Sequence, residues 1–185
     1  IQYFDSAEFA QLADITRRRR RAVLEQILQE KVKPDGEALV GDLPAHKVEP
    51  KHVRILRDRR SDRIEAANWR MRALRALFRW ASRDAFLIDR NPAADVPFLK
   101  SASTGFHTWT VEEIEQFEAH WPIGTRARLA LAVLAFTGVR RSDAVILGNQ
   151  HLEGGTLRGG WLKFMQAKGS NRRAKVVEVP VLDEH

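Results

Sequence analysis

The segment from Phe136 to Asp143 combines residue types that could bind an anion. It reads Phe-Thr-Gly-Val-Arg-Arg-Ser-Asp and follows an apolar run from Leu129 to Leu134. The run predicts a helix at 125–136 that is buried on most sides, and Gly138 is placed to end it in the left-handed conformation. Arg140 would then stand at the edge of a core, where a preorganised guanidinium can hold an anion. The alternative is that Arg140 only interacts with the helix dipole.

A second group of cations lies between two strand-like runs. Trp161 to Ala167 and Val176 to Val181 are rich in β-branched and apolar residues, and the polar segment between them predicts a hairpin loop. This loop contains two lysines, Lys168 and Lys175.

The positive charge of the chain is concentrated in one block. The net charge is +7, and residues 51–90 hold 12 basic against 5 acidic side chains. Residues 1–50 hold 8 against 9, and residues 91–185 hold 11 against 10. Arginine dominates the block, and its planar group makes forked contacts to phosphate that lysine does not make. The block therefore predicts a nucleic-acid-binding surface.

Helices are expected to carry this surface. Residues 5–31 predict one or two helices, with Thr16 as a candidate N-cap, and Pro50 can open a helix at 51–60. The clearest helix is 65–83, in which Ala67, Met71, Leu74, Phe78 and Ala81 line one face and four arginines line another. A row of phosphates would relieve the repulsion within the arginine stripe, although an ordinary solvated face is the alternative. The candidate DNA-binding residues are Arg17, Arg18, Arg21, Arg72, Arg75, Arg79 and Arg83.

The chain divides into two predicted domains. Residues 1–98 form a helical DNA-binding domain, and a linker follows at 99–108. Thr110 and Glu113 form a capping box, with Trp109 and Ile114 as its hydrophobic staple, which opens a second domain at 109–185. The expected fold class is mainly α, with a small antiparallel β-hairpin near the end.

Composition excludes several classes of protein. The sequence has no cysteine, so it holds no disulfide framework and no thiolate zinc site, and its six histidines lack the spacing of a helical metal site. We therefore expect no metal and no cofactor. No apolar run is long enough to cross a membrane, and the start lacks the features of a signal peptide. We expect a cytoplasmic, nucleoid-associated protein whose native N-terminus lies upstream of Ile1.

The motif Thr-Gly-x-Arg-x-Ser-Asp at 137–143, the apolar helix before it and the hairpin after it resemble the tyrosine recombinase (phage-type integrase) family. The segment from Gly105 to Arg141 is similar to bacterial integrases of mobile elements, and the basic helical domain resembles the core-binding domain of that family. The resemblance implies a SAM-like helical core-binding domain followed by the N-terminal part of an α+β catalytic domain.

The resemblance also implies roles for individual residues. Arg140 matches the first catalytic arginine, which holds a non-bridging oxygen of the scissile phosphate. Lys168, preferred over Lys175 because it stands where the first strand ends, matches the hairpin lysine that protonates the departing 5′ oxygen. Asp143 matches the acidic position that supports the site. The His-x-x-Arg motif and the tyrosine nucleophile of the family do not occur downstream, and we expect them beyond residue 185.

The implied activity is site-specific recombination of double-stranded DNA through a covalent 3′-phosphotyrosyl intermediate. The complete protein would act as a tetramer on attachment sites, with a DNA-bending or directionality protein as a further partner. The chain shown would bind DNA as a monomer without cutting it. Two alternatives remain: a non-catalytic integrase-like DNA-binding regulator, and a helical protein-interaction module whose basic character is incidental.

Overall fold

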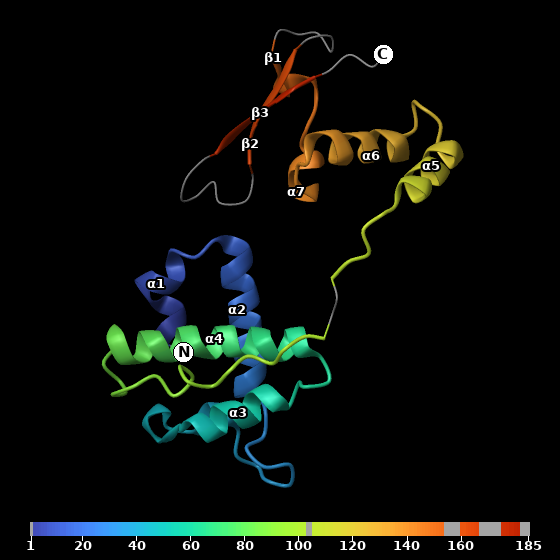
Figure 1. The fold of residues 1–185 in the computed structure, drawn as a ribbon. Coiled ribbons are helices and arrows are strands. Elements are labelled where there is room, and N and C mark those ends of the chain that lie inside the picture. Colours follow the sequence, from blue (N-terminus) through green and yellow to red (C-terminus); the bar gives the residue numbers. More distant parts are fainter. Residues whose placement is uncertain (1, 103–104, 154–159, 167–174, 182–185) are drawn as a thin grey trace. The chain divides into compact units, whose positions relative to one another are not determined.

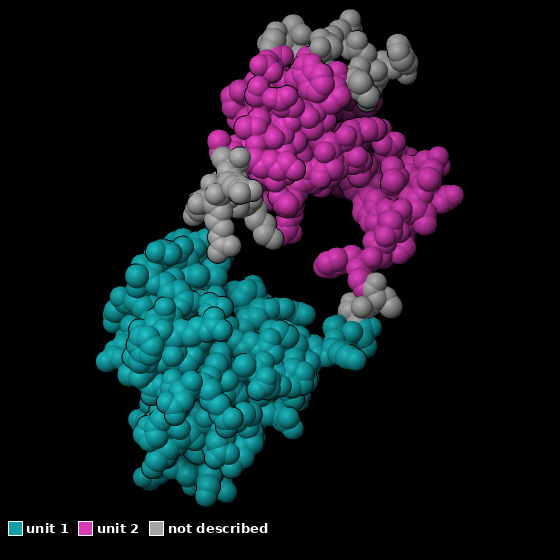
Figure 2. All heavy atoms as spheres, turned by 60° about the vertical axis from the view of Figure 1, so that its left-hand side comes forward, with its two compact units in different colours: residues 1–104 teal, residues 105–185 magenta. Residues whose placement is uncertain are grey.

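The chain folds into two compact units, residues 1–104 (unit 1) and 105–185 (unit 2), coloured teal and magenta in Figure 2. The computed structural model describes residues 2–102, 105–153, 160–166 and 175–181. The fold is mainly helical with a small antiparallel sheet near the C-terminal end, as the sequence predicts (Figure 1). The boundary between the units falls within the predicted linker at 99–108.

Unit 1 is a helical domain. A 3-10 turn (Gln2–Asp5) and α1 (Ala7–Ala10) precede the three longer helices, which are α2 (Asp14–Leu28), α3 (Pro50–Asp58) and α4 (Ile64–Arg83). Two further 3-10 turns, Val40–Asp42 and Ala45–Lys47, interrupt the connection from α2 to α3. Pro50 occupies the first turn of α3, as predicted.

The start of α2 differs from its prediction. The helix begins at Asp14, so Thr16 is not its N-cap, and the capping position belongs to Ala13, whose side chain makes no capping hydrogen bond. Asp14 instead stabilises the first turn, because its carboxylate contacts Arg17 at 2.5 Å and Arg18 at 2.9 Å. An acidic group in the first turn also complements the positive end of the helix dipole.

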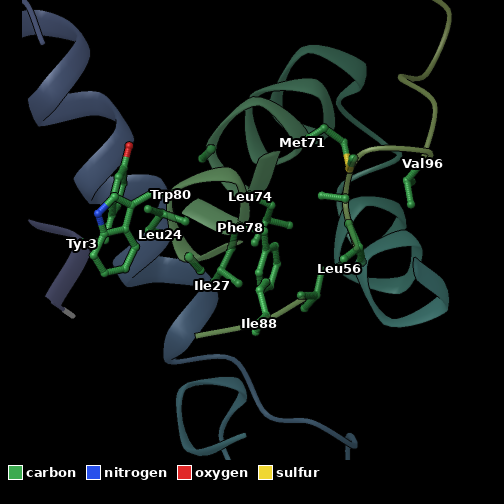
Figure 3. Close-up of a cluster of buried hydrophobic side chains, with 14 of the residues drawn as sticks. Tyr3, Leu24, Ile27, Leu56, Met71, Leu74, Phe78, Trp80, Ile88 and Val96 are labelled. Atoms are coloured by element: carbon green, nitrogen blue, oxygen red, sulfur yellow. The ribbon is translucent and has the colours of Figure 1, made fainter. Parts of the chain in front are cut away.

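The core of unit 1 forms where α4 packs against α2 and α3 (Figure 3). The apolar face predicted for α4 is confirmed, because all five of its residues are buried. Tyr3 and Trp80 extend the core toward the N-terminus, with their ring centroids 5.4 Å apart. Other members of the core include Leu24, Ile27, Val53, Leu56, Ile88, Ala93 and Val96.

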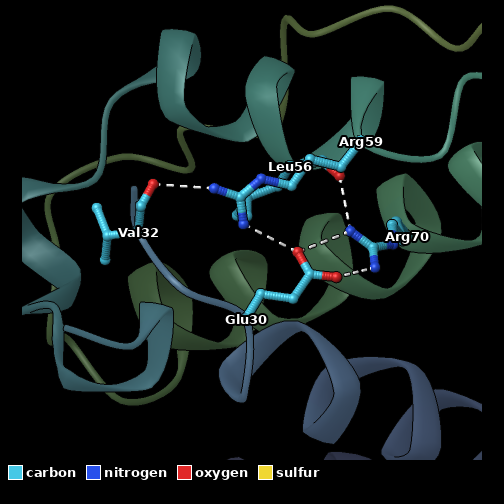
Figure 4. A network of polar contacts seen from close by, with 5 residues as sticks. All are labelled: Glu30, Val32, Leu56, Arg59 and Arg70. Carbon is cyan, nitrogen blue, oxygen red and sulfur yellow. Dashed lines mark hydrogen bonds and ion pairs between the residues drawn. The ribbon is translucent and has the colours of Figure 1, made fainter. Parts of the chain in front are cut away.

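A charged network ties the three long helices together (Figure 4). Glu30, just after α2, accepts hydrogen bonds from Arg59 at 3.1 Å and from Arg70. Arg70 also donates to the carbonyl of Leu56 at 3.0 Å, and Arg59 donates to the carbonyl of Val32 at 2.9 Å. Burial acts to raise the pKa of Glu30, but the hydrogen bonds from the two arginines outweigh it and lower that pKa below its ordinary value.

The segment that follows α4 runs back along the helix. Arg75 donates to the carbonyls of Ala93 at 3.0 Å and Val96 at 2.7 Å, and Asn68 exchanges two hydrogen bonds of 2.9 Å with the backbone of Leu99. Because satisfied backbone groups hold the segment in place, the chain stays attached to α4 as far as Leu99. The first residue of the predicted linker is therefore part of unit 1.

Unit 2 combines α5 (Val111–His120), α6 (Arg126–Thr137) and α7 (Arg141–Ala144) with a small sheet. The sheet has the order β1 (Leu152–Glu153), β2 (Trp161–Met165), β3 (Val176–Pro180), with antiparallel neighbours. The capping box is confirmed, because the Thr110 side chain accepts from the Glu113 backbone at 3.3 Å and the Glu113 carboxylate accepts from the Thr110 backbone at 2.8 Å. The ring of Trp109 packs against Phe117, with centroids 5.5 Å apart.

The predicted burial of α6 is wrong. No residue of this helix is buried, and the side chains of Leu129 and Phe136 are 65% and 78% exposed. An apolar helix is buried only where other elements cover it, and the described elements of unit 2 cover α6 only in part. Neither α6 nor any other described helix has the length and apolar character that a membrane span requires.

Candidate nucleic-acid interface

The arginines predicted on α2 to bind DNA are mostly engaged within unit 1. Arg17 and Arg18 share the carboxylate of Asp14, and the hydrogen bond from Arg17 and the charge of Arg18 lower the pKa of Asp14. The guanidinium carbon of Arg21 lies 4.6 Å from the ring centroid of Phe4, within the range of a cation–π contact. Arg18 and Arg21 remain exposed, so both can still add to the positive potential of this surface.

The arginine stripe predicted on α4 does not form one set of free cations. Arg75 is used inside unit 1, where its guanidinium donates to two carbonyls of the returning segment, so it is not a free cation. Arg79 pairs with Glu8 at 2.7 Å, and that hydrogen bond raises the pKa of Arg79. Arg72 lies 3.8 Å from Glu65, and Arg83 is exposed in the last turn of α4. Of these four arginines, only Arg83 has no hydrogen-bond, ion-pair or ring partner among the described residues.

A different basic cluster forms between α2 and the start of α4, and we call it the Arg19 cluster. It consists of Arg19, Arg60, Arg63 and Trp69, which line a hollow of about 310 Å³. The guanidinium carbon of Arg19 lies 3.7 Å from the centre of the Trp69 ring. Arg60 has no acidic partner among the described residues, and Arg63 has only a loose one, Asp62 at 3.8 Å.

The charge balance of the Arg19 cluster favours an anion. Glu65 is the only acidic residue that lines the hollow, and it lies near Arg72, outside the cluster. Three guanidinium groups around one concave surface can hold phosphate oxygens, and the face of an indole can stack with a base or a guanidinium. Stacking on Trp69 also fixes the orientation of Arg19, which reduces the entropy lost on binding. The cluster can therefore bind a nucleic-acid backbone.

The candidate DNA-binding residues predicted from the sequence do not include Arg19, Arg60 or Arg63. Arg19 lies within the arginine run at 17–21, but the sequence alone does not distinguish it from its neighbours. Arg60 and Arg63 belong to the loop between α3 and α4, where no helical periodicity marks them. The one available signal was Trp69, an indole beside the arginine stripe on α4, since aromatic residues among basic ones are typical of single-strand and backbone contacts.

In unit 2, Arg140 follows directly on the end of α6. Gly138 adopts the left-handed conformation with φ of 62°, as predicted, and its backbone N–H donates to the carbonyl of Leu134 at 3.1 Å. Arg140 then occupies the N-cap position of α7. Its side chain is exposed, so the expectation that it stands at the edge of a core is not met by the described residues.

The side chain of Arg140 reaches the end of the β2–β3 pair where β2 stops and β3 begins. Its Nη1 donates to Oε1 of Gln166 at 3.0 Å, and the backbone N–H of Gln166 donates to the carbonyl of Lys175 at 3.1 Å. The structure thus brings Arg140 to the strand end that leads into the predicted lysine loop. Lys168, the preferred proton donor, lies outside the described residues.

Asp143 lies in α7 and is fully buried. Its backbone N–H donates to the carbonyl of Arg140 at 2.8 Å, which closes the first turn of α7. Because Arg140 is exposed and Asp143 is fully buried, Asp143 is placed to support the α7 backbone that carries Arg140. That position is compatible with a supporting role and not with direct contact to a substrate.

Tyr3, the only tyrosine in the sequence, is unsuited to attack a phosphate. Its side chain is fully buried in the core of unit 1, and its hydroxyl accepts a hydrogen bond from Arg20 at 2.7 Å. Burial raises its pKa above the ordinary value, although the bond from Arg20 acts in the opposite direction. Among the described residues, moreover, no group of histidines and carboxylates is arranged to hold a metal ion.

Comparison with known proteins gives no match: no protein-family model, no curated protein and no solved structure matches this chain.

Proposed function

We propose that the chain binds duplex DNA through unit 1 and contributes part of a tyrosine recombinase phosphate site through unit 2. The observation that carries the proposal is the Arg19 cluster, where an indole and three arginines, besides the Glu30-bound Arg70, line a hollow with a single acidic residue in its lining. Neutralising phosphates with several arginines releases counterions, which supplies most of the affinity of non-specific DNA binding.

The recombinase part of the proposal is supported by the position of Arg140. Its hydrogen bond to Gln166 holds it beside the strand end that precedes Lys168 in the sequence. Phosphoryl transfer needs positive charge around the equatorial oxygens and an acid for the leaving oxygen. Arg140 would bind a non-bridging oxygen, Lys168 would protonate the 5′ oxygen, and Asp143 would fix the backbone that carries Arg140.

The nucleophile of such a reaction would have to be a tyrosine other than Tyr3, which is buried in unit 1. The competing function is a non-catalytic regulator that occupies recombination sites. A reading frame that continues past His185 and encodes His-x-x-Arg and a tyrosine would favour the enzyme, and a stop codon there would favour the regulator. In the complete enzyme, Arg140→Ala should abolish the covalent adduct with a nicked attachment site.

DNA binding is tested with a fluorescein-labelled duplex of 30 base pairs and mixed sequence, by anisotropy at several NaCl concentrations. Binding should weaken steeply with salt. The double variant R19A/R63A should lower the slope of log K against log salt by about 2, because each lost phosphate contact removes about 0.9. A matched control, R54A/R90A, removes the same charge from exposed arginines outside the Arg19 cluster and should change the slope much less.

Two results would contradict this assignment. If the duplex does not bind, or binds without salt dependence, unit 1 is not a DNA-binding domain. If R19A/R63A and R54A/R90A lower the slope equally, the chain binds through its overall charge and the Arg19 cluster has no special part.

A further inference from the structure

Unit 1 contains a larger cavity that the proposed DNA contacts do not use. It measures about 920 Å³ and lies between α2, α3, α4 and the connection formed by residues 29–48. Its volume falls within the usual range of small-molecule sites, about 300–1,000 Å³. Most of its lining is apolar, and Leu28, Val40, Leu74, Leu77 and Phe78 are examples.

Large apolar side chains surround this cavity without being buried. Leu43, Ile55 and Leu87 all line it and are 42%, 53% and 50% exposed. Single exposed apolar residues are ordinary, but several around one cavity mark a surface that a ligand can cover. At roughly 25 cal/mol per Å² of apolar surface, covering them would contribute to the affinity for an apolar chain.

The connection that closes one side of the cavity is held by its backbone. Val32 N donates to the carbonyl of Ala38 and Val40 N to that of Glu30, both at 2.8 Å. Gly41 then passes so close to α2 that a β-carbon there would lie 3.1 Å from the carbonyl oxygen of Leu28. The wall is therefore preformed, which reduces the entropy lost when a ligand binds.

The charges along the cavity are mainly positive. Lys33 and Lys47 line it, both are exposed, and neither has an acidic partner among the described residues. Arg59 is already bound to Glu30 and Val32. Asp42 is the only acidic residue in the lining, and its carboxylate accepts the backbone N–H of Leu39 at 3.2 Å. Two free ammonium groups beside an apolar cavity complement a molecule with an apolar chain and an anionic head.

We propose that this cavity binds one long-chain fatty acid, with its alkyl chain against the apolar walls and its carboxylate between Lys33 and Lys47. The occupant is a free, single-chain carboxylate and not a lipid within a membrane. This site goes beyond the proposed DNA binding, because the residues that line it are not those of the Arg19 cluster.

The experiment uses the whole 185-residue chain and the fluorescent probe 11-(dansylamino)undecanoic acid. The dansyl emission should rise with one-to-one stoichiometry, and dodecanoate should displace the probe. K33E/K47E should weaken probe binding about tenfold, since it replaces two exposed attractions by repulsions. The matched control R83E/K100E makes the same charge change at exposed basic residues outside the cavity lining and should leave the affinity unchanged.

A second variant tests the cavity itself. Leu43→Glu places a carboxylate at an exposed position in the lining, so it should weaken the probe without loss of folding, as checked by circular dichroism. Absence of probe binding would overturn the proposal, and so would equal weakening by K33E/K47E and R83E/K100E. Cosedimentation with phosphatidylglycerol vesicles, without binding of the free probe, would also overturn it and assign the surface to a membrane.

Discussion

Apolar residues make up a similar fraction of unit 1 and of unit 2. The two units nevertheless bury these residues to very different extents. The buried apolar side chains of unit 1 come from every helix and from the segment after α4. Among the described residues of unit 2, Phe164 is the only large apolar side chain that is buried. Leu129, Phe136 and Val145 are all more than half exposed.

The difference shows what an apolar sequence can and cannot do alone. In unit 1, α2 and α3 flank α4, so the apolar face of α4 meets partners on both sides. In unit 2, α6 is more apolar than α4 but lacks comparable cover among the described elements. Burial, and not composition, determines how much free energy of unfolding an apolar residue contributes. We therefore expect unit 1 to be the more stable of the two.

The largest expected effect is the loss of unfolding free energy when an apolar side chain is truncated in unit 1 and in unit 2. Met71 in α4 is fully buried, so Met71→Ala should lower the free energy of unfolding of unit 1 by about 3 kcal/mol through lost burial and a new cavity. Leu134 in α6 is 39% exposed, and Leu134→Ala should cost at most about 1 kcal/mol in unit 2. Urea titrations followed by amide NMR signals assigned to each unit measure both values. Equal costs would show that α6 is covered in solution.

The second effect concerns the network that joins the helices of unit 1. Glu30→Gln removes the charge that faces Arg59 and the buried Arg70, and it should cost about 2 kcal/mol in the same titration. The control Asp14→Asn removes an acid from an exposed cluster with Arg17 and Arg18 and should leave the urea midpoint nearly unchanged. If both variants were equally harmless, the Glu30 network would not stabilise unit 1.

The pH dependence of Glu30→Gln has a defined sign. The pKa of Glu30 is lowered in the folded state below its ordinary value of 4.5. The contribution of the carboxylate is therefore fully present above about pH 5 and is lost as the pH falls through the folded pKa. The difference in unfolding free energy between the native protein and Glu30→Gln should shrink over that range. A constant difference would mean that the charge of Glu30 is not what stabilises the network.

Features with local causes were predicted well from the sequence. The apolar face of α4, the capping box at Thr110 and the left-handed Gly138 all follow from residues within one or two helical turns. The antiparallel pairing of β2 with β3 likewise follows from two apolar runs separated by a polar segment.

Features that depend on distant partners were not predictable in the same way. Arg79 is paired with Glu8, 71 residues earlier, and Arg75 binds carbonyls that only the return of the chain along α4 brings near. The Arg19 cluster joins residues from α2, a loop and α4, so no single window of sequence contains it. A pattern of arginines thus predicts where basic charge lies, while the folded partners determine which arginines remain able to bind a phosphate.

The smallest expected effect on stability comes from substitutions at Gly138, in the turn between α6 and Arg140 in unit 2. Gly138 has φ of 62°, and a β-carbon there would meet nothing within 4 Å, so the cost of Gly138→Ala is backbone strain alone, about 1 kcal/mol. Gly138→Asn should cost less, because asparagine tolerates the left-handed conformation. In amide NMR spectra, Gly138→Ala should shift the signals of Arg140 and Gln166 more than Gly138→Asn does, since the strained turn would displace the guanidinium from its acceptor. Equal shifts would mean that the conformation of Gly138 does not position Arg140 for its hydrogen bond to Gln166. Unit 2 would then not differ from unit 1 in depending on a local turn to place its functional side chain.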